Sequence, residues 1–446
     1  MHFQGVPERL GQALSTTIYE AEQQYVAPGL QEVSQLSRLV IKQGRGCRLI
    51  DVEGKSYLDF MAGVAVCSLG HSHPNYIAAL REQLDRVTAG SFTTENRLAL
   101  LRLIASLTPG DLNRTQLYSG GAEAVEAAIR LAKSYTGKFE ILSFWGGFHG
   151  KTGGVLGLIG DPFKQHWGIL HPGLHLAPYP DCYRCPFNMD YPGCSMFCLD
   201  FVGKVIENNT AGSLAAIIVE TIQGTAGNII PPPEFLPGLL EIAHEHGALL
   251  IADEMITGFG RTGMMFGSNH TGLVPDIMTI GKGMGGGFPI SGLVSTDEIT
   301  ASRPFSKPSS SSSSYGGNPL ASTAGLATIQ TIVDEALVEN SREVGAHLLQ
   351  GLSALQEKYE FIGDVRGRGL LIGVELVKDR NTREPLDKAV TRQIFLETLK
   401  RGLICMNYKP NFRINPPLIL SRAEADEGLA ILDEVFAHVT RSIPYR

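Results

Sequence analysis

The sequence predicts an α/β protein built around a mostly parallel sheet, together with a smaller α+β domain. Strand-like and helix-like segments alternate through the central half of the chain, as a parallel sheet requires. Several strand-like segments are continuous apolar runs, which is typical of strands covered on both faces. The two chain ends have a different, mixed pattern, so we expect them to come together as the smaller domain.

The central segments follow one another in a clear order. Residues 123–133 are rich in good helix formers, and Gly137 is a suitable C-terminal cap. Strands are expected at 139–144 and 214–219, a helix at 235–246, and further strands at 248–252 and 277–280. Asp253 directly follows one of these strands, and Lys282 closely follows the last.

The chain ends carry the elements of the smaller domain. Residues 46–60 predict a small hairpin that turns at Gly54. Beyond a serine tract, helices are expected at 320–333, 344–357 and 392–401, and an alternating strand at 370–377. We therefore expect one large domain over residues 60–325 and a small domain made from residues 1–59 and 326–446.

Length and composition are those of an ordinary globular protein. The chain has 446 residues, of which 43% are hydrophobic and 19% charged, so one or two domains are expected. A net charge of −7 gives no reason to expect nucleic acid or an anionic membrane as a partner. The apolar stretches are interrupted well before the about 18 residues that a membrane-spanning helix needs.

Targeting and redox signals point to the cytoplasm. The first five residues have no basic region followed by an apolar core, so no secretion signal is expected. Seven cysteines, an odd number in a chain without such a signal, favour a reducing compartment.

Lys282 is the first candidate for chemistry. It follows the strand expected at 277–280 and is surrounded by glycines that add no side-chain bulk. Burial at that position would lower the pKa of its amine and make it a nucleophile, able to hold an aldehyde cofactor as a Schiff base. The alternative is a solvated lysine in a glycine-rich turn.

Two further segments have the chemistry of a cofactor site. Residues 119–123 (SGGAE) open the expected helix 123–133, where first-turn N–H groups and the helix dipole favour a phosphate. A simple helix cap is the alternative, and the segment is not a dinucleotide fingerprint. Asp253 ends a buried strand, where its carboxylate can hold a protonated ring nitrogen or, alternatively, cap a turn. Because both strands are expected in one parallel sheet, Asp253 and Lys282 can meet at its carboxyl edge.

An aromatic residue and an arginine complete the candidate set. Phe148 follows another strand and could stack on a flat ring, although an ordinary core position is the alternative. Arg413 alternates with apolar side chains, and a guanidinium is suited to bind a carboxylate in a bidentate manner. A surface arginine is the alternative there. The serine tract at 309–314 is either a flexible linker or, with the turn that follows it, an anion-contacting loop.

A phosphate cradle, a carboxylate for a ring nitrogen, an aromatic plate and a buried lysine are the parts that pyridoxal phosphate needs. With these parts the chain resembles the class III (ω-amino-acid type) aminotransferases, which are fold-type I pyridoxal phosphate enzymes. The resemblance extends from residues 70–74 (GHSHP) to 416–418 (PPL) and is most specific at 253–263 and around Lys282.

The resemblance carries expectations about fold and activity. It implies a large domain with a mostly parallel seven-stranded sheet, and amino transfer from an amino acid or amine donor to a 2-oxo acid such as pyruvate by a ping-pong mechanism. It implies that Lys282 forms the Schiff base and then moves a proton at the substrate α-carbon. Asp253 would pair with the pyridine nitrogen, and Arg413 would take the substrate carboxylate.

The remaining roles concern how the cofactor is held. Gly121 and Ala122 would give backbone donors to its phosphate, while Phe148 and Met255 would lie on opposite faces of its ring. Ser314 takes the place of a family threonine that reaches the phosphate of the neighbouring subunit. The resemblance therefore implies a homodimer with shared sites.

Two departures from the family pattern bear on the substrate. Ile256 stands where many relatives have a glutamine that contacts the cofactor's ring hydroxyl. Thr225 stands where ω-aminotransferases have a glutamate that can cover the arginine when an amine end must bind. We therefore hypothesise that Arg413 stays available, which favours α-amino acids or 2-oxo acids over purely ω-amino substrates.

Other reaction classes share part of this pattern. Residues 363–385 resemble 2,2-dialkylglycine decarboxylase and the class III amino-acid racemases, so decarboxylation-dependent transamination and racemisation are the alternatives. Against the decarboxylase, Val64 replaces a glutamine and Phe148 replaces a tryptophan. A nucleotide-dependent oxidoreductase lacks its dinucleotide loop here, and a non-catalytic scaffold would not need Lys282 and Asp253.

Four of the seven cysteines lie close together in the sequence, flanked by prolines, and these are Cys182, Cys185, Cys194 and Cys198. The first pair has zinc-ligand spacing, and four thiolates could close a structural tetrahedral site. A loop of reduced thiols, or a local disulfide formed on oxidation, is the competing interpretation. No metal is assigned to the active site.

Overall fold

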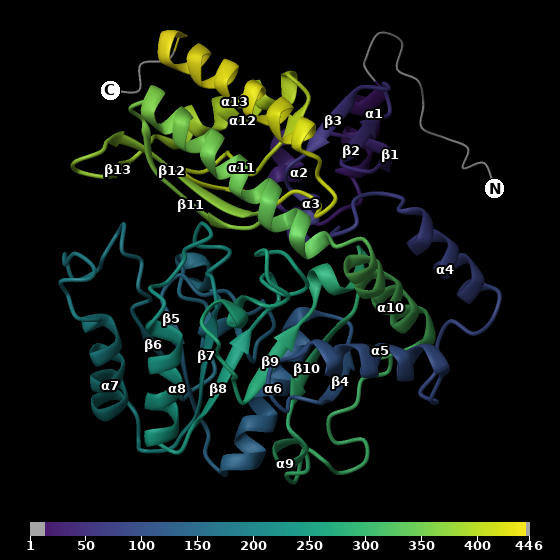
Figure 1. Cartoon of the computed structure of the whole chain (residues 1–446), viewed down its shortest axis with the longest axis vertical. Helices are drawn as coiled ribbons and strands as arrows, with labels where there is room; N and C mark the ends of the chain where they lie inside the picture. The colour runs from purple at the N-terminus through teal and green to yellow at the C-terminus, as the bar shows by residue number, and fades with distance from the viewer. Residues whose placement is uncertain (1–13, 443–446) are drawn as a thin grey trace.

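A seven-stranded sheet forms the centre of the molecule, and its strands lie in the lower half of Figure 1. The computed structural model describes residues 14–442. The strand order is β4–β10–β9–β8–β7–β5–β6, and β10 runs antiparallel to both of its neighbours. The prediction of a mostly parallel α/β sheet is confirmed. The strands are β4 (Arg114–Tyr118), β5 (Glu140–Phe144), β6 (Leu174–Ala177), β7 (Leu214–Glu220), β8 (Leu249–Asp253), β9 (Ile277–Ile280) and β10 (Ser291–Ser295).

Helices cover both faces of this sheet, which explains the unbroken apolar runs in its strands. All seven residues of β7 are buried. Ala216 and Ile218 belong to the hydrophobic cluster that contains helix α6 (Gly121–Thr136), whereas Ile217 and Val219 belong to the cluster that contains helix α8 (Phe235–Glu245). Successive side chains of a strand point to opposite faces. The apolar run therefore buries both sides of β7 under helices.

Register brings the carboxyl ends of three central strands together. Glu220 at the end of β7 pairs with Asp253 at the end of β8, and Asp253 pairs with Thr279 of β9. Lys282 comes two residues after β9 ends. This edge of the sheet is where ligands bind in open α/β folds.

Two smaller sheets lie above the large one in Figure 1, and the first of them combines strands from both chain ends. Strand β14 pairs in parallel with β3, so that a C-terminal strand extends the hairpin that was predicted near the N-terminus. The strands are β1 (Ile41–Arg45), β2 (Arg48–Asp51), β3 (Ser56–Asp59), β14 (Leu403–Ile404), and, in the second sheet, β11 (Ile362–Arg368), β12 (Leu371–Asp379), β13 (Glu384–Pro385) and β15 (Asn411–Ile414).

The other α-helices within the described residues pack around these sheets. They are α1 (Leu14–Glu22), α2 (Glu32–Ser37), α3 (Ala62–Ala65), α4 (Pro74–Leu84), α5 (Glu95–Leu107), α7 (Phe197–Asn209), α9 (Asp297–Thr300), α10 (Pro319–Asp334), α11 (Leu337–Lys358), α12 (Lys388–Lys400) and α13 (Arg422–Ser442). The helix expected at 344–357 begins earlier than predicted, because Leu337 and Ser341 already lie on its buried face. Glu339 and Asn340 lie between them, and these polar residues interrupt the apolar pattern at the start of the helix.

The domain boundaries stay predictions. The expected division after residue 325 falls inside the continuous helix α10. One hydrophobic cluster also includes residues from both expected domains, among them Leu58, Leu100, Ile372 and Phe436. The two parts therefore share packing at their junction.

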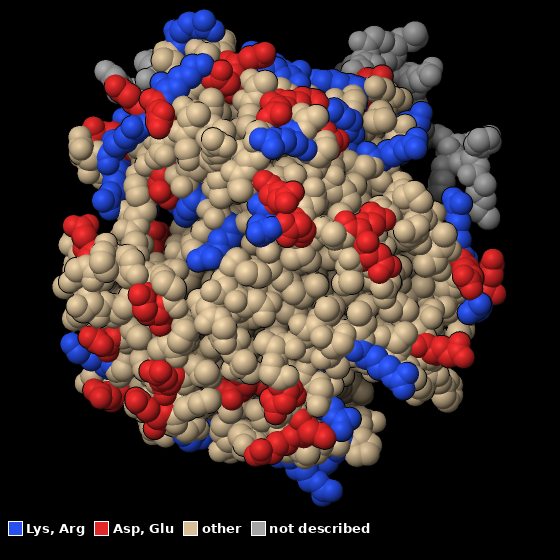
Figure 2. Space-filling model, viewed as in Figure 1, with Lys and Arg blue, Asp and Glu red and all other residues tan. Residues whose placement is uncertain are grey.

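The surface and the chain start bear on the expected partners. Acidic and basic side chains are interspersed over the face shown in Figure 2. Within residues 14–442, no helix is both long and apolar enough to cross a bilayer. The five residues that carry no secretion signal lie outside the described part of the chain.

The cysteine-rich segment forms a small apolar pocket beside α7. Cys182, Cys185, Cys194 and Cys198 are free thiols, and all four line a cavity of about 20 Å³. Burial raises the pKa of Cys182 and of Cys198 to about 11, and the neighbouring thiols add to this. Among the described residues, no group of three or more His, Cys, Asp or Glu side chains is arranged to hold a metal ion.

Candidate active site

A cavity of about 380 Å³ lies at the carboxyl edge of the large sheet. It is built mainly from the segments that follow β4, β5, β8 and β9, which gather at this edge because those strands run in the same direction. The lining residues are Val66, Ser119, Gly121, Ala122, Phe148, His149, Gly150, Asp253, Met255, Lys282, Gly287, Phe288, Pro289 and Ile290.

Lys282 enters this cavity from a short 3₁₀ turn after β9, with a positive φ of 44°. The glycines beside it are required by close packing. A Cβ on Gly281 would lie 2.6 Å from Met255 Sδ, and one on Gly283 would lie 2.5 Å from Ser68 Oγ. Burial lowers the pKa of the Lys282 amine, the charge of Arg413 lowers it further, and the carboxylates of the site oppose this shift. The amine is thus desolvated, as a nucleophile needs to be.

Asp253 is the buried carboxylate opposite Lys282, with an exposed fraction of 2%. His149 Nδ1 donates to its Oδ2 at 2.7 Å, and Thr279 Oγ1 donates to its Oδ1 at 3.0 Å. Burial by itself would raise the pKa of Asp253. The hydrogen bond and charge of His149, together with the charge of Lys282, outweigh burial and hold the pKa below its usual value. Asp253 is therefore kept ionised without contact to bulk water.

Two functional neighbours were missed by the sequence analysis. His149 is 3% exposed and reaches Asp253 although 104 residues separate them. Glu220 accepts from the N–H groups of Phe148 at 2.8 Å and Gly224 at 2.9 Å. Burial raises the pKa of Glu220. Its position at the end of β7, matching Asp253 at the end of β8, is the signal that could have identified it.

The start of α6 faces the same cavity. Glu123 Oε2 accepts from the N–H groups of Ser119 at 3.1 Å and Gly120 at 2.7 Å, which fixes the loop before the helix. The N–H groups of Gly121 and Ala122 come next, and first-turn N–H groups have no carbonyl partner within their own helix. With the helix dipole they form a site for an anion.

Phe148 and Met255 provide apolar surfaces of the cavity. Glu220 holds the backbone of Phe148, and the ammonium of Lys151 lies 5.9 Å from the centre of the Phe148 ring. Met255 is 9% exposed, and a Cβ on Gly121 would lie 3.3 Å from its Sδ. The methionine therefore packs tightly between the two glycine-containing turns.

Two of the predicted site residues do not line this cavity. Arg413 lies on β15, where Nη1 donates to the Gly224 carbonyl at 3.3 Å and Nη2 lies 3.5 Å from Met406 Sδ. Its charge acts on Lys282, so it is in electrostatic range of the site. Ser314 is exposed and lines a separate surface cavity next to Tyr315. The structure thus brings six of the predicted residues together and leaves these two outside the lining.

The serine tract is anchored to the large sheet. Ser311 is buried, its carbonyl accepts from Gln116 Nε2 and from Tyr118 Oη at 2.7 Å each, and its hydroxyl contacts Tyr118 at 2.8 Å. The interpretation of residues 309–314 as a flexible linker is therefore wrong at its centre, because hydrogen bonds to β4 hold it there.

Comparisons with known proteins agree with this geometry. The family model for class III aminotransferases matches residues 30–436. The chain belongs to the class III aminotransferases. It is 36% identical over 409 residues to a leucine/methionine racemase of Thermococcus litoralis, covering 90% of this chain and 91% of that protein. It is also 36% identical over 437 residues to 5-aminovalerate aminotransferase of Pseudomonas putida, covering 96% and 100%.

A solved relative gives the same result for the fold. An amine transaminase from an uncultivated Pseudomonas species, in a PLP-bound form, superposes with a TM-score of 0.86 and is 32% identical, covering 93% of this chain and 98% of that one. The chain is a transaminase that uses pyridoxal phosphate, with an amino donor and a keto-acid acceptor as substrates. The cavity fits this cofactor, because it combines a helix N-terminus, a buried ionised carboxylate and a desolvated amine.

Crowding the glycine beside Lys282 provides a test of this fit. We expect Gly281→Ala to weaken pyridoxal phosphate binding by roughly 5- to 150-fold, as overpacking by about 1–3 kcal/mol would. The reason is that the new methyl group drives Met255 into the cavity, while the extended φ of 171° itself suits alanine. The measurement is equilibrium titration of the apoprotein with the cofactor.

Two further variants serve as controls. Gly153→Ala adds a methyl group where nothing lies within 4 Å and should leave cofactor affinity unchanged. Adding Met255→Ala to Gly281→Ala should restore affinity in part. Unchanged affinity in Gly281→Ala alone would show that Met255 does not border the bound cofactor.

Proposed function

We propose that the desolvated Lys282 amine and the ionised Asp253 carboxylate carry the amino transfer. The observation that carries this proposal is their common position in one cavity, at the ends of the neighbouring strands β9 and β8. Pyridoxal phosphate, when bound, supplies an aldehyde that captures an amine and a ring that accepts electron density. Lys282 would hold that aldehyde between turnovers, and its freed amine would move the proton at the substrate α-carbon.

Asp253 would keep a proton on the ring nitrogen. Its lowered pKa means that it remains an anion, and the donors His149 and Thr279 fix both of its oxygens. An anion at this position stabilises a cationic ring nitrogen, which makes the ring a better electron acceptor. His149 and Thr279 would act as positioning residues for Asp253.

The other lining residues would hold the cofactor in place. The N–H groups of Gly121 and Ala122 would bind its phosphate at the start of α6. Phe148 and Met255 would lie on the two faces of its ring, where apolar contacts exclude water. The amino group then passes from donor to enzyme and from enzyme to a 2-oxo acid such as pyruvate, in two half-reactions.

Arg413 would bind the substrate carboxylate. The Arg413 guanidinium donates to a backbone carbonyl and lies beside a thioether. Within residues 14–442, it forms no ion pair with a carboxylate. Thr225 cannot cover that charge. We therefore propose α-amino acids and 2-oxo acids as preferred substrates over purely ω-amino compounds.

A homodimer would complete the phosphate site. Ser314 is exposed beside Tyr315, which is 67% exposed, and Phe92 on a neighbouring segment is 87% exposed. These segments meet because Gly317 packs against Arg97, which donates to Thr93. An exposed aromatic face of this kind suits a second copy of the chain, and Ser314 would reach the cofactor phosphate bound in that copy.

The free cysteines also support a reducing compartment such as the cytoplasm.

Removing the amine tests the central assignment. We expect Lys282→Ala to lose turnover by at least about 10⁴-fold, because no other described residue that lines the cavity carries an amine that could replace the nucleophile. Its thermal unfolding should stay close to that of the wild type. Turnover is measured with a panel of amino donors and pyruvate, following amino transfer, carbon dioxide release and stereochemistry together.

The matched control is Lys204→Ala, which removes an exposed lysine from α7 and should keep full activity. Wild-type activity in Lys282→Ala would refute the assignment. Stoichiometric carbon dioxide release, or inversion of the donor without transfer, would point instead to the decarboxylase or racemase reaction.

Supplying the missing carboxylate tests the proposed preference. We expect wild-type enzyme to use L-alanine better than 4-aminobutyrate, and Thr225→Glu to shift the ratio of their kcat/KM values toward 4-aminobutyrate by about tenfold or more, because a new glutamate can pair with Arg413. Thr225→Gln introduces a side chain of the same size as glutamate but without its charge, and it should not shift the ratio of kcat/KM values. A wild-type enzyme that strongly prefers 4-aminobutyrate would contradict the proposal.

A further inference from the structure

The turn formed by residues 224–228 is hydrogen-bonded both to the large sheet and to the strand that carries Arg413. Residues 224–228 follow β7, and Glu220 holds the turn from one side through the Gly224 N–H group. On the other side, Arg413 donates to the Gly224 carbonyl at 3.3 Å. The position of the Arg413 guanidinium therefore depends on where this turn lies.

Two more side chains bind carbonyl groups of the same turn. Asn411 Nδ2 donates to the Ala226 carbonyl at 2.7 Å. Arg366 of β11 donates to the Gly227 carbonyl twice, from Nη2 at 2.8 Å and from Nε at 3.2 Å. Three side chains of the second sheet thus hold three carbonyl groups of one short turn.

Arg366 is itself held rigidly. Its Nη1 donates to Asp364 Oδ2 at 2.6 Å and its Nη2 to Glu375 Oε1 at 2.9 Å, and its side chain is only 12% exposed. A Cβ on Gly227 would lie 2.9 Å from Arg366 Nη2, so the turn and the guanidinium are in close contact. A planar guanidinium with five donors can make these four hydrogen bonds at once, whereas the three donors of a lysine ammonium cannot.

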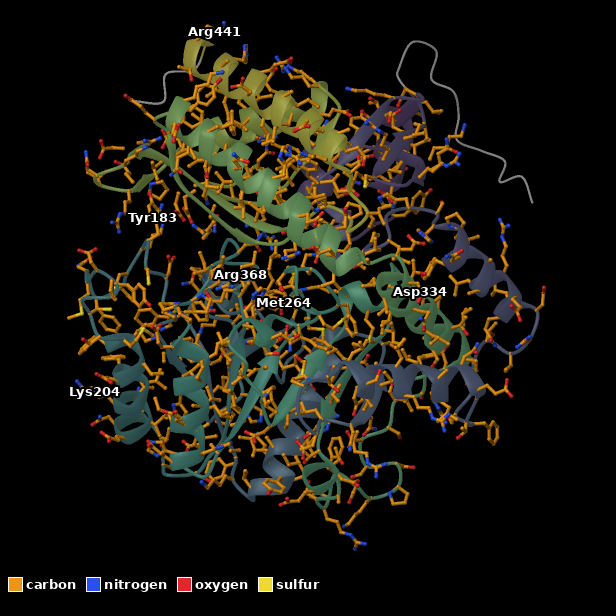
Figure 3. The ribbon with its side chains drawn as sticks, viewed as in Figure 1. Tyr183, Lys204, Met264, Asp334, Arg368 and Arg441 are labelled. Atoms are coloured by element: carbon orange, nitrogen blue, oxygen red, sulfur yellow. The ribbon has the colours of Figure 1, made fainter. Side chains whose placement is uncertain are left out.

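A second arginine, in the cysteine-rich loop, binds the same glutamate as Arg366. Arg184 lies between Cys182 and Cys185 and donates to Glu375 Oε2 at 3.2 Å, so the 3% exposed Glu375 is shared by two arginines. Tyr183 beside it lies between this loop and strands β11–β13 (Figure 3), where a Cβ on Gly363 would lie 2.2 Å from its hydroxyl. The loop therefore contacts the second sheet next to the residues that hold Arg366.

We infer that Arg366 is a positioning residue for carboxylate-bearing substrates. By fixing the Gly227 carbonyl it sets the course of the turn, and through the Gly224 carbonyl it sets the guanidinium of Arg413. Arg184 supports it by sharing Glu375. This inference rests on the proposed role of Arg413, and it extends substrate recognition to residues that do not touch the cavity.

A pair of donors that differ only in the carboxylate measures this effect. The probes are L-alanine and ethylamine, and the quantity is the ratio of their kcat/KM values in the half-reaction, followed by cofactor absorbance. We expect Arg413→Gln to lower this ratio about 100-fold, and Arg366→Gln to lower it about tenfold, since small displacements of a binding group are costly. Inhibition by propionate, which has the carboxylate but no amine, should weaken in parallel in both variants.

Further variants separate positioning from folding. Arg366→Lys keeps the charge and should still lower the ratio. Arg184→Gln removes a side chain that is 31% exposed, is therefore easier to tolerate, and should lower the ratio in the same direction by a smaller factor. Arg368→Gln, two residues further along β11, removes an arginine that contacts His270 and should leave the ratio unchanged (Figure 3).

The results separate the proposed role of Arg366 from the proposed role of Arg413. A reduced ratio in Arg413→Gln together with an unchanged ratio and unchanged propionate inhibition in both Arg366→Lys and Arg184→Gln would overturn the positioning inference and leave the proposed function intact. Equal losses with both donors in the Arg366 variants would also overturn it, because that result indicates general damage. An unchanged ratio in Arg413→Gln would overturn the role of Arg413, and the inference with it.

Discussion

Burial of opposite charges at one edge of the parallel sheet is the constraint on which the site depends. A desolvated amine and a desolvated carboxylate are each costly, and each is tolerated only with partners. Asp253 has its partners in His149 and Thr279, so it stays an anion. Lys282 has a lowered pKa, so its amine can lose its proton and react. The same cavity thus holds a carboxylate that stays ionised and an amine that can be neutral.

The sheet and the helices around it create this situation. Parallel strands place their carboxyl ends together, and helices on both faces exclude water from the strands that lead to them. The second sheet then brings Arg413 toward the same edge on β15. In the proposed function, the catalytic groups lie on the large sheet, whereas recognition of the substrate carboxylate would depend on contacts between the two sheets, above all at the turn 224–228.

Much of the fold could be predicted because its signals are local. The apolar run of β7 and the helix formers of α6 indicate their structure without knowledge of the rest of the chain. Strands β4, β6 and β10 were not predicted, because their sequences mix polar and small residues with apolar ones and form no continuous apolar run. The first seven residues of α11 were missed because the polar residues among them hide two buried positions.

The same distinction applies to the site. Lys282 and Asp253 could be identified because each follows a recognisable strand. His149 and Arg366 form hydrogen bonds with residues that lie 104 and 139 positions away in the sequence, so no local pattern reveals these contacts. Ser314 lies outside the cavity, and its proposed role depends on a second copy of the chain. The sequence alone could not predict contacts that form only when the chain folds or when two copies assemble.

The most direct test of the central claim is to locate the covalent attachment of the cofactor. The holoenzyme is reduced with borohydride, digested, and its peptides are analysed by mass spectrometry. The account predicts a stable pyridoxyl phosphate group on Lys282 in the peptide that follows β9. Attachment to a different lysine, such as Lys151 beside the Phe148 ring, or no covalent attachment to the reduced protein, would contradict it.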